Sequence, residues 1–194
     1  QYGSGADNIN EDAGRCPFYF VTYNEGIYVG YKYYETRYED VVLGTKDVGN
    51  YDYASTVTFP FGYGQSYTRF VWEDYTVEGP DAAGDITVTL TVRNDGDRAG
   101  RDVVQLYYQS PYTEYDKEHH IEKAAVNLAA FHKTALLQPG DSEPVTFTVN
   151  LDEFVSYDDS GAGGYLLEAG DYFLTAASDA HTAVNNILSR KATM

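Results

Sequence analysis

The chain has 194 residues, and 13 Lys and Arg against 30 Asp and Glu give it a formal net charge of −17. This length suits one large domain, or one domain with part of another, and a hydrophobic content of 43% is enough for a packed core. The negative charge argues against nucleic acids and anionic membrane surfaces as partners, and no apolar run approaches the roughly 20 residues of a membrane span.

The first part of the chain, residues 1–58, lacks the regular alternation of a half-buried strand. Residues 18–34 are rich in aromatic side chains and favour a strand. Residues 35–55 are acidic and rich in Tyr and Gly, and they predict either a long functional loop or a disordered insert. Residues 59–75 begin with the string FPFGYG and predict a linker held in place by aromatic side chains.

From about residue 70 the sequence predicts a mainly β fold. Apolar residues alternate with polar ones in 86–92 and again in 145–151, the period of a half-buried strand. Residues 103–108 and 172–176 predict two further strands, and turns rich in Gly, Pro and Asp separate the segments. This spacing is typical of an immunoglobulin-like β-sandwich, which we assign to residues 76–181.

Two segments near this sandwich have helical features. Apolar residues in 121–131 fall near helical spacing, while a strand through residues 126–128 followed by the turn at 138–141 is the competing interpretation. Close to the end of the chain, Thr182 is the predicted cap of a short helix that contains residues 183–188.

The standard catalytic and metal-binding signatures are absent from the sequence. Cys16 stands alone and is expected to be inert, because neither a His nor a helix N-terminus is evident near it to lower the pKa of the thiol. His119 and His120 would point to opposite faces of a strand, and residues 7–12 lack the ligand order of a calcium loop. We therefore expect no metal and no cofactor.

Carboxylates remain as candidates for chemistry, because paired carboxylates hydrolyse glycosidic bonds. Glu25 lies among aromatic residues, an environment that raises the pKa of a carboxyl, and Glu35, Glu39 and Asp40 are among the carboxylates of the acidic stretch. Their spacing does not single out a pair. The candidate substrate-binding residues are Glu25, Tyr28, Glu35, Glu39 and Asp40.

Two long strings carry a resemblance to a known family. Residues 25–34, EGIYVGYKYY, and residues 59–70, FPFGYGQSYTRF, resemble consecutive motifs of family-3 glycoside hydrolases, the group that includes bacterial β-glucosidases. Four later strings resemble the fibronectin type III-like domain of that family, namely Val92–Gly96, Gly100–Tyr107, Leu137–Asp141 and Glu168–Tyr172. The matches follow the family's order over about residues 20–180. The family's pattern also favours the strand in the ambiguous segment.

The resemblance implies a retaining β-glycosidase built from a (β/α)8 barrel, an α/β sandwich and this fibronectin type III-like domain. Such an enzyme hydrolyses terminal β-glucosides by double displacement, without a cofactor. In the family the nucleophilic Asp lies in the barrel and the acid/base Glu lies upstream of the EGIYVGYKYY string, and neither motif is present here. We therefore expect residues 1–58 to be the end of the α/β sandwich, and the 194-residue chain alone to be inactive.

The resemblance leaves two placements open. Residues 182–194 form either a tail or a link to a missing domain, since in some family members the barrel follows the fibronectin-like domain. The acidic stretch 35–55 either reaches over the sugar site of the barrel or packs at the domain junction.

Three functions are compared on this basis. The first is a non-catalytic fragment whose sandwich braces the barrel and the rest of the α/β sandwich. The second is a stand-alone carbohydrate-binding module with exposed aromatic side chains, which the 20 Tyr residues could supply. The third is a spacer. The apolar residues 18–34 favour the first, because they have the character of a domain edge that lacks its partner. In the isolated chain such an edge would promote homodimers. The missing signal peptide and Asn-x-Ser/Thr sequon favour the cytoplasm, with secretion left open.

Overall fold

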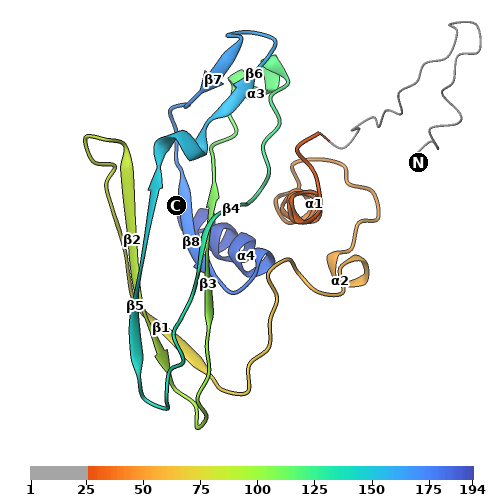
Figure 1. Cartoon of the computed structure of the whole chain (residues 1–194). Coiled ribbons are helices and arrows are strands. Elements are labelled where there is room, and N and C mark those ends of the chain that lie inside the picture. The colour runs from red at the N-terminus through yellow and green to blue at the C-terminus, as the bar shows by residue number, and fades with distance from the viewer. Residues whose placement is uncertain (1–25) are drawn as a thin grey trace, which may run out of the picture.

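Two antiparallel sheets face each other, and helices cover one side and one end of them in this computed structural model, which describes residues 26–194 (Figure 1). The elements in chain order are α1 (Tyr31–Leu43), α2 (Tyr53–Thr56), β1 (Phe70–Glu78), β2 (Asp85–Asn94), β3 (Val103–Gln109), α3 (Glu114–His119), β4 (Asn127–Lys133), β5 (Ser142–Asn150), the 3₁₀ helix η2 (Leu151–Phe154), β6 (Ser156–Asp158), β7 (Gly164–Leu166), β8 (Phe173–Ala177) and α4 (Ala180–Lys191). Among the described residues, no helix combines the length and apolar character that crossing a membrane requires.

The sandwich consists of one sheet in the order β1-β2-β5 and a second in the order β4-β3-β8. Strands β2 and β5 pair antiparallel, with Val88 opposite Phe147 and Leu90 opposite Val145. Because side chains alternate between the faces of a strand, these residues all point into the space between the sheets. The four strands predicted from periodicity are confirmed, although the strand predicted over 145–151 ends at Asn150 and η2 follows.

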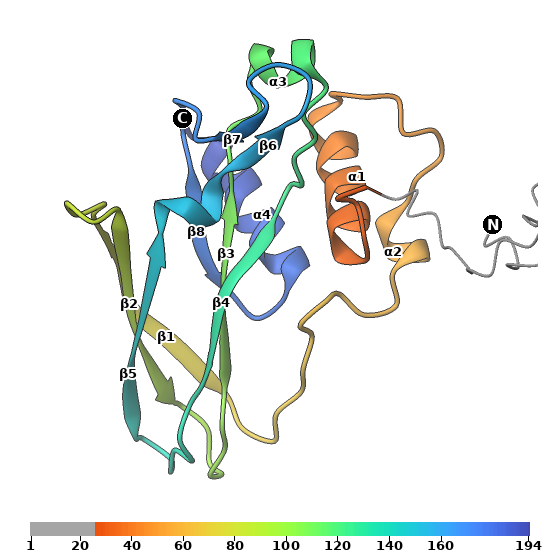
Figure 2. The ribbon, with the colours of Figure 1, turned by 45° about the horizontal axis from the view of Figure 1, so that its top comes forward.

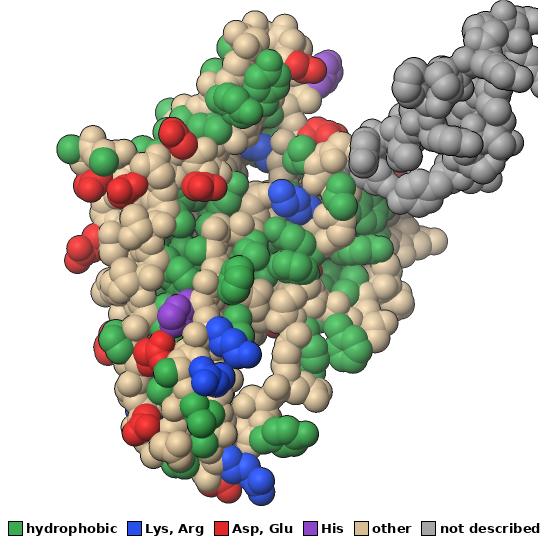
Figure 3. All heavy atoms as spheres, in the orientation of Figure 1, with side chains coloured by type: hydrophobic (Ala, Val, Ile, Leu, Met, Phe, Trp, Pro, Cys, Tyr) green, Lys and Arg blue, Asp and Glu red, His purple; other side chains and the backbone are tan. Residues whose placement is uncertain are grey.

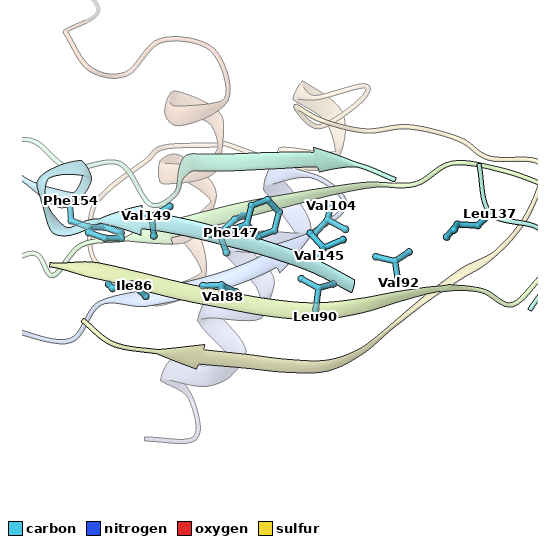
Figure 4. Packing of buried hydrophobic residues seen from close by; sticks show 11 residues of the cluster. Ile86, Val88, Leu90, Val92, Val104, Leu137, Val145, Phe147, Val149 and Phe154 are labelled. Atoms are coloured by element: carbon cyan, nitrogen blue, oxygen red, sulfur yellow. The ribbon is translucent and has the colours of Figure 1, made fainter. Parts of the chain in front are cut away.

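The core between the sheets is built from the apolar face of each strand (Figure 4). Its buried members are Ile86, Val88, Leu90, Val92, Val104, Leu106, Leu137, Val145, Phe147, Val149 and Phe154. Burying one such side chain contributes about 1.5–3 kcal/mol, so this cluster is the main favourable term in folding of the sandwich. The sandwich is therefore a stable platform for the helices beside it.

The ambiguous segment 121–131 resolves in favour of the strand, which runs from Asn127 to Lys133 as β4. Residues 121–126 form neither a helix nor a strand, but Ala125 and Val126 are buried in a second apolar cluster with α4. The near-helical spacing arises because some of these residues pack against α4 and others against the core of the sandwich.

The prediction for the first part of the chain is wrong in two respects. Residues 31–43 form α1, where we expected a strand up to Tyr34 and a loop from Glu35 onward. The residues of α1 that pack against α4 and its apolar cluster include Tyr31, Glu35 and Tyr38, which follow helical spacing. A charged residue at the centre of this stripe and the β-prone tyrosines on both sides hide the helical period.

The predicted C-terminal helix is confirmed and is longer than expected. Its N-cap is Asp179 rather than Thr182, because the Asp179 Oδ1 atom accepts the backbone N–H of Thr182 at 2.7 Å. The buried face of α4 consists of Ala180, Ala183, Val184, Ile187 and Leu188. Figures 1 and 2 both place α4 between the sheet that contains β8 and helix α1.

Candidate functional site

The candidate residue Glu35 is buried between α1, α2 and α4, with 1% of its surface exposed. The Tyr53 hydroxyl donates a hydrogen bond to its Oε1 atom at 2.5 Å, and His181 Nδ1 lies 3.0 Å from its Oε2 atom. We call the set Glu35, Tyr38, Tyr53, His181 and Asn185 the helix junction. Three separate stretches of the chain meet there.

Aromatic stacking holds the helix junction together around its carboxylate. The Tyr53 and His181 rings stack with centroids 3.9 Å apart, and the Tyr38 ring lies 4.5 Å from that of His181. The Tyr38 hydroxyl also donates to Asn185 Oδ1 at 2.9 Å. The imidazole is therefore fixed in position by two rings and one carboxylate.

Burial sets the ionisation of this cluster. It raises the pKa of the Glu35 carboxyl, and the hydrogen bonds from Tyr53 and His181 offset only part of that effect. Burial also raises the pKa of the Tyr53 hydroxyl, and the neighbouring Glu35 carboxylate raises it further. The tyrosine therefore keeps its proton and remains a hydrogen-bond donor to Glu35.

A second carboxylate of α1, Glu39, binds the end of α4 and the end of β3. Lys191 Nζ lies 2.8 Å from Glu39 Oε1, and Gln109 Nε2 donates to both carboxylate oxygens at 3.0 Å. The same Gln109 amide donates to the carbonyl of Ala125 at 2.7 Å. Glu39 thus links α1, α4 and the sandwich.

The remaining described candidates, Tyr28 and Asp40, lie with Glu39 around a hollow of about 550 Å³ between α1 and the sandwich. The Tyr28 hydroxyl donates to the carbonyl of Lys123 at 3.3 Å, and burial raises its pKa to about 12. Asp40 Oδ1 accepts the hydroxyl of Thr45 at 2.6 Å. The structure therefore brings Tyr28, Glu39 and Asp40 to one hollow and directs Glu35 to the helix junction instead.

The bonding of these groups argues for support rather than catalysis. Glycoside hydrolysis needs one carboxylate free to attack or activate water and one free to protonate the leaving group. Both oxygens of Glu35 and both of Glu39 already bind protein groups. Glu25 lies outside the described residues.

Within residues 26–194 no cluster of three or more His, Asp or Glu side chains has the geometry of a metal site. The prediction that His119 and His120 alternate on a strand is wrong. His119 is the last residue of α3, and His120 follows in the left-handed conformation as its C-cap. Cys16 and the acidic residues 7–12 lie outside the described part of the chain.

The partners of the two α1 carboxylates were not foreseen from the sequence. His181 lies 146 residues after Glu35, and Lys191 lies 152 residues after Glu39, so no local spacing connects them. The sequence of α4 contains one weak indication of a polar contact face, because His181 and Asn185 are four residues apart and share one side of the helix.

Known proteins resemble this chain over most of its length. The fibronectin type III-like domain model matches residues 102–180. β-Glucosidase A of Butyrivibrio fibrisolvens is 39% identical over 169 residues, which are 79% of this chain and 18% of that protein. The structure of a Paenibacillus barengoltzii β-glucosidase is 37% identical and covers 84% of this chain and 16% of its own, with a TM-score of 0.65. The structure of the glycoside hydrolase family 3 (GH3) β-glucosidase of Bifidobacterium adolescentis is 26% identical. The match covers 85% of this chain and 21% of that protein, with a TM-score of 0.66.

This chain thus spans between 16% and 21% of the length of these three β-glucosidases.

Proposed function

Because residues 102–180 belong to the fibronectin type III-like family and the chain matches one segment of GH3 β-glucosidases, we propose that it is the non-catalytic bracing part of such an enzyme. The parent enzyme would hydrolyse terminal β-glucosides by double displacement, without a cofactor. The catalytic carboxylates would then lie outside this chain. The engagement of Glu35 and Glu39 in contacts between helices supports that division of labour.

The bracing role rests on one observation, which is that α4 contacts both the sandwich and α1. Its apolar face is buried against Tyr107 and other residues of the second sheet. His181 and Asn185, beside that face, bind Glu35 and Tyr38 of α1, and Lys191 in the last turn binds Glu39. A helix that contacts both parts fixes the orientation of the N-terminal segment relative to the sandwich.

The partner surface that we propose comprises the exposed apolar last turn of α1 and the linker that follows α2, which lies against the start of α1. Its members are Val41, Val42, Leu43, Phe59, Phe61 and Tyr63, each 44% to 65% exposed. Figure 3 shows hydrophobic side chains at the surface between the sandwich and the helices. Exposed apolar side chains of this kind support an interface, here with the barrel and the rest of the α/β sandwich. In the isolated chain the same surface favours homodimers.

The test of the bracing role uses the full-length parent enzyme with Ile187→Ala, a change in the buried face of α4. Removing a 2%-exposed isoleucine costs about 2–5 kcal/mol of stability. We expect kcat on an aryl β-glucoside to be unchanged at a temperature where the enzyme stays folded, and thermal inactivation to be faster. The control is Ser189→Ala, an exposed position on the same helix.

Two results would overturn the proposal. A loss of kcat in folded Ile187→Ala enzyme would give this region a role in the chemistry. If Ile187→Ala enzyme were inactivated by heat at the same rate as the Ser189→Ala control, α4 would not stabilise the enzyme.

A further inference from the structure

A groove of about 420 Å³ lies between the β6–β7 hairpin, the segment 120–127 and the start of α1. Its rim carries the side chains of Lys32, His120, Glu122, Asn127, Tyr157 and Asp159. We propose that this hairpin groove binds one sugar unit of a neutral oligosaccharide, with Tyr165 next to it as the following contact along the sugar chain.

The aromatic part of the site is a cross-strand pair on the hairpin. Tyr157 pairs with Tyr165 across β6 and β7, and their ring centroids lie 5.2 Å apart at an interplanar angle of 72°. The two residues are 56% and 75% exposed, although aromatic rings contribute most to stability when buried. Exposed tyrosines supply apolar area with a polar tip and few rotatable bonds, which suits the C–H face and hydroxyls of a pyranose ring.

The hairpin that carries this pair is held rigidly. Buried Asp158 accepts the backbone N–H groups of Ser160, Gly161 and Ala162 at 3.0, 2.8 and 2.6 Å. It also accepts the hydroxyl of Tyr115 at 2.7 Å, which fixes the hairpin to α3. These hydrogen bonds place the pKa of the Asp158 carboxyl well below its usual range. A preorganised surface loses little conformational freedom when it binds a ligand.

The polar part of the groove has unused hydrogen-bonding capacity. Among the described residues, no hydrogen bond or ion pair involves the side chains of Lys32, His120, Glu122, Asn127 or Asp159. Lys32 is a donor, Glu122 is an acceptor, and the Asn127 amide is both. Sugar hydroxyls both donate and accept, so they match this mixed set.

The charges and the size of the groove distinguish between ligand classes. An anionic ligand would meet Glu122 and Asp159 beside Lys32, on a chain with a net charge of −17, because the second lysine of the groove, Lys123, is already paired with Asp116 and Glu168. An apolar peptide would bury all these polar groups without partners, at a cost of about 1–3 kcal/mol each. A neutral sugar avoids both costs, and the volume falls within the range of about 300–1,000 Å³ usual for small-ligand sites.

The test is titration of the purified 194-residue chain with cellotetraose, followed by calorimetry and by backbone amide NMR shifts. We expect saturable binding with shifts confined to residues 26–32, 120–127 and 156–166. Tyr157→Ala should weaken binding at least tenfold, and Glu122→Gln should also weaken it. Both side chains are exposed, so unchanged NMR spectra elsewhere establish that the variants are folded.

The matched control is Tyr67→Ala, which removes a 94%-exposed tyrosine from the linker, outside the groove. Equal binding by this variant and by Tyr157→Ala, or no saturable binding by the wild type, would overturn the proposal. The β-glucan identity of the sugar rests on the proposed function. Equal affinity for maltotetraose would contradict that identity alone and support a site for neutral sugars of either linkage.

Discussion

At the residue scale, the structure shows what the candidate carboxylates of α1 contact within the chain. Glu35, Glu39 and Asp40 each bind other protein groups, and a role of these residues in substrate binding stays a prediction. Asp40 binds Thr45, five residues away, but His181 and Lys191, which bind Glu35 and Glu39, lie 146 and 152 residues away and are brought there by folding. Burial of an individual side chain such as Glu35 is a tertiary property that no local pattern encodes.

The raised pKa of Glu35 predicts a specific pH dependence of stability. The folded chain holds this proton to higher pH than the unfolded chain does. The free energy of unfolding therefore falls as the pH rises from the unfolded pKa of the carboxyl toward its raised folded pKa, and is level above that. The Glu35→Gln variant lacks this titrating carboxyl. Its free energy of unfolding relative to that of the wild type should therefore increase between pH 4 and pH 7.

Urea unfolding of the wild type and of Glu35→Gln between pH 4 and pH 7 measures the difference in their free energies of unfolding. Groups that titrate identically in the two proteins cancel in this difference. Glu143→Gln serves as the control, because His132 lowers the pKa of that carboxyl and its term has the opposite sign. A flat difference for Glu35→Gln across the whole range would contradict the burial argument.

At the element scale, prediction succeeded where one side of an element is uniformly apolar. The alternation in β2 and β5 is regular because both strands face a dry core on one side and water on the other. Helix α1 was missed because Glu35 interrupts its buried stripe. Helix α3 was missed although Thr113 and Asp116 form a capping box, a pattern that the sequence does display.

The cap of α4 yields a prediction at this scale. Asp179→Ala removes the acceptor of the Thr182 backbone N–H and should lower the free energy of unfolding by about 0.5–2 kcal/mol. Asp52→Ala removes the equivalent cap from α2, which has four residues and none buried, so its effect should be smaller. Chemical denaturation of the two variants gives the comparison, and equal losses would show that α4 contributes no more to the fold than α2.

At the scale of the whole molecule, the sequence motifs identified the relatives more readily than they described the N-terminal part. The chain that carries the FPFGYGQSYTRF string and the turn-anchored strings of the sandwich matches 18% of a relative that is several times longer. The assignment of residues 1–58 to an α/β sandwich stays a prediction, as does a cytoplasmic location. The contacts that make that segment recognisable as a domain would come from residues outside this chain.

The most direct test of a non-catalytic chain is hydrolysis of an aryl β-glucoside by the purified 194 residues beside the full-length parent. We expect turnover by the parent and none by the chain at equal molar concentration. Turnover by the chain that disappears in Glu35→Gln or Glu39→Gln would contradict a non-catalytic role and would place the catalytic carboxylates on α1.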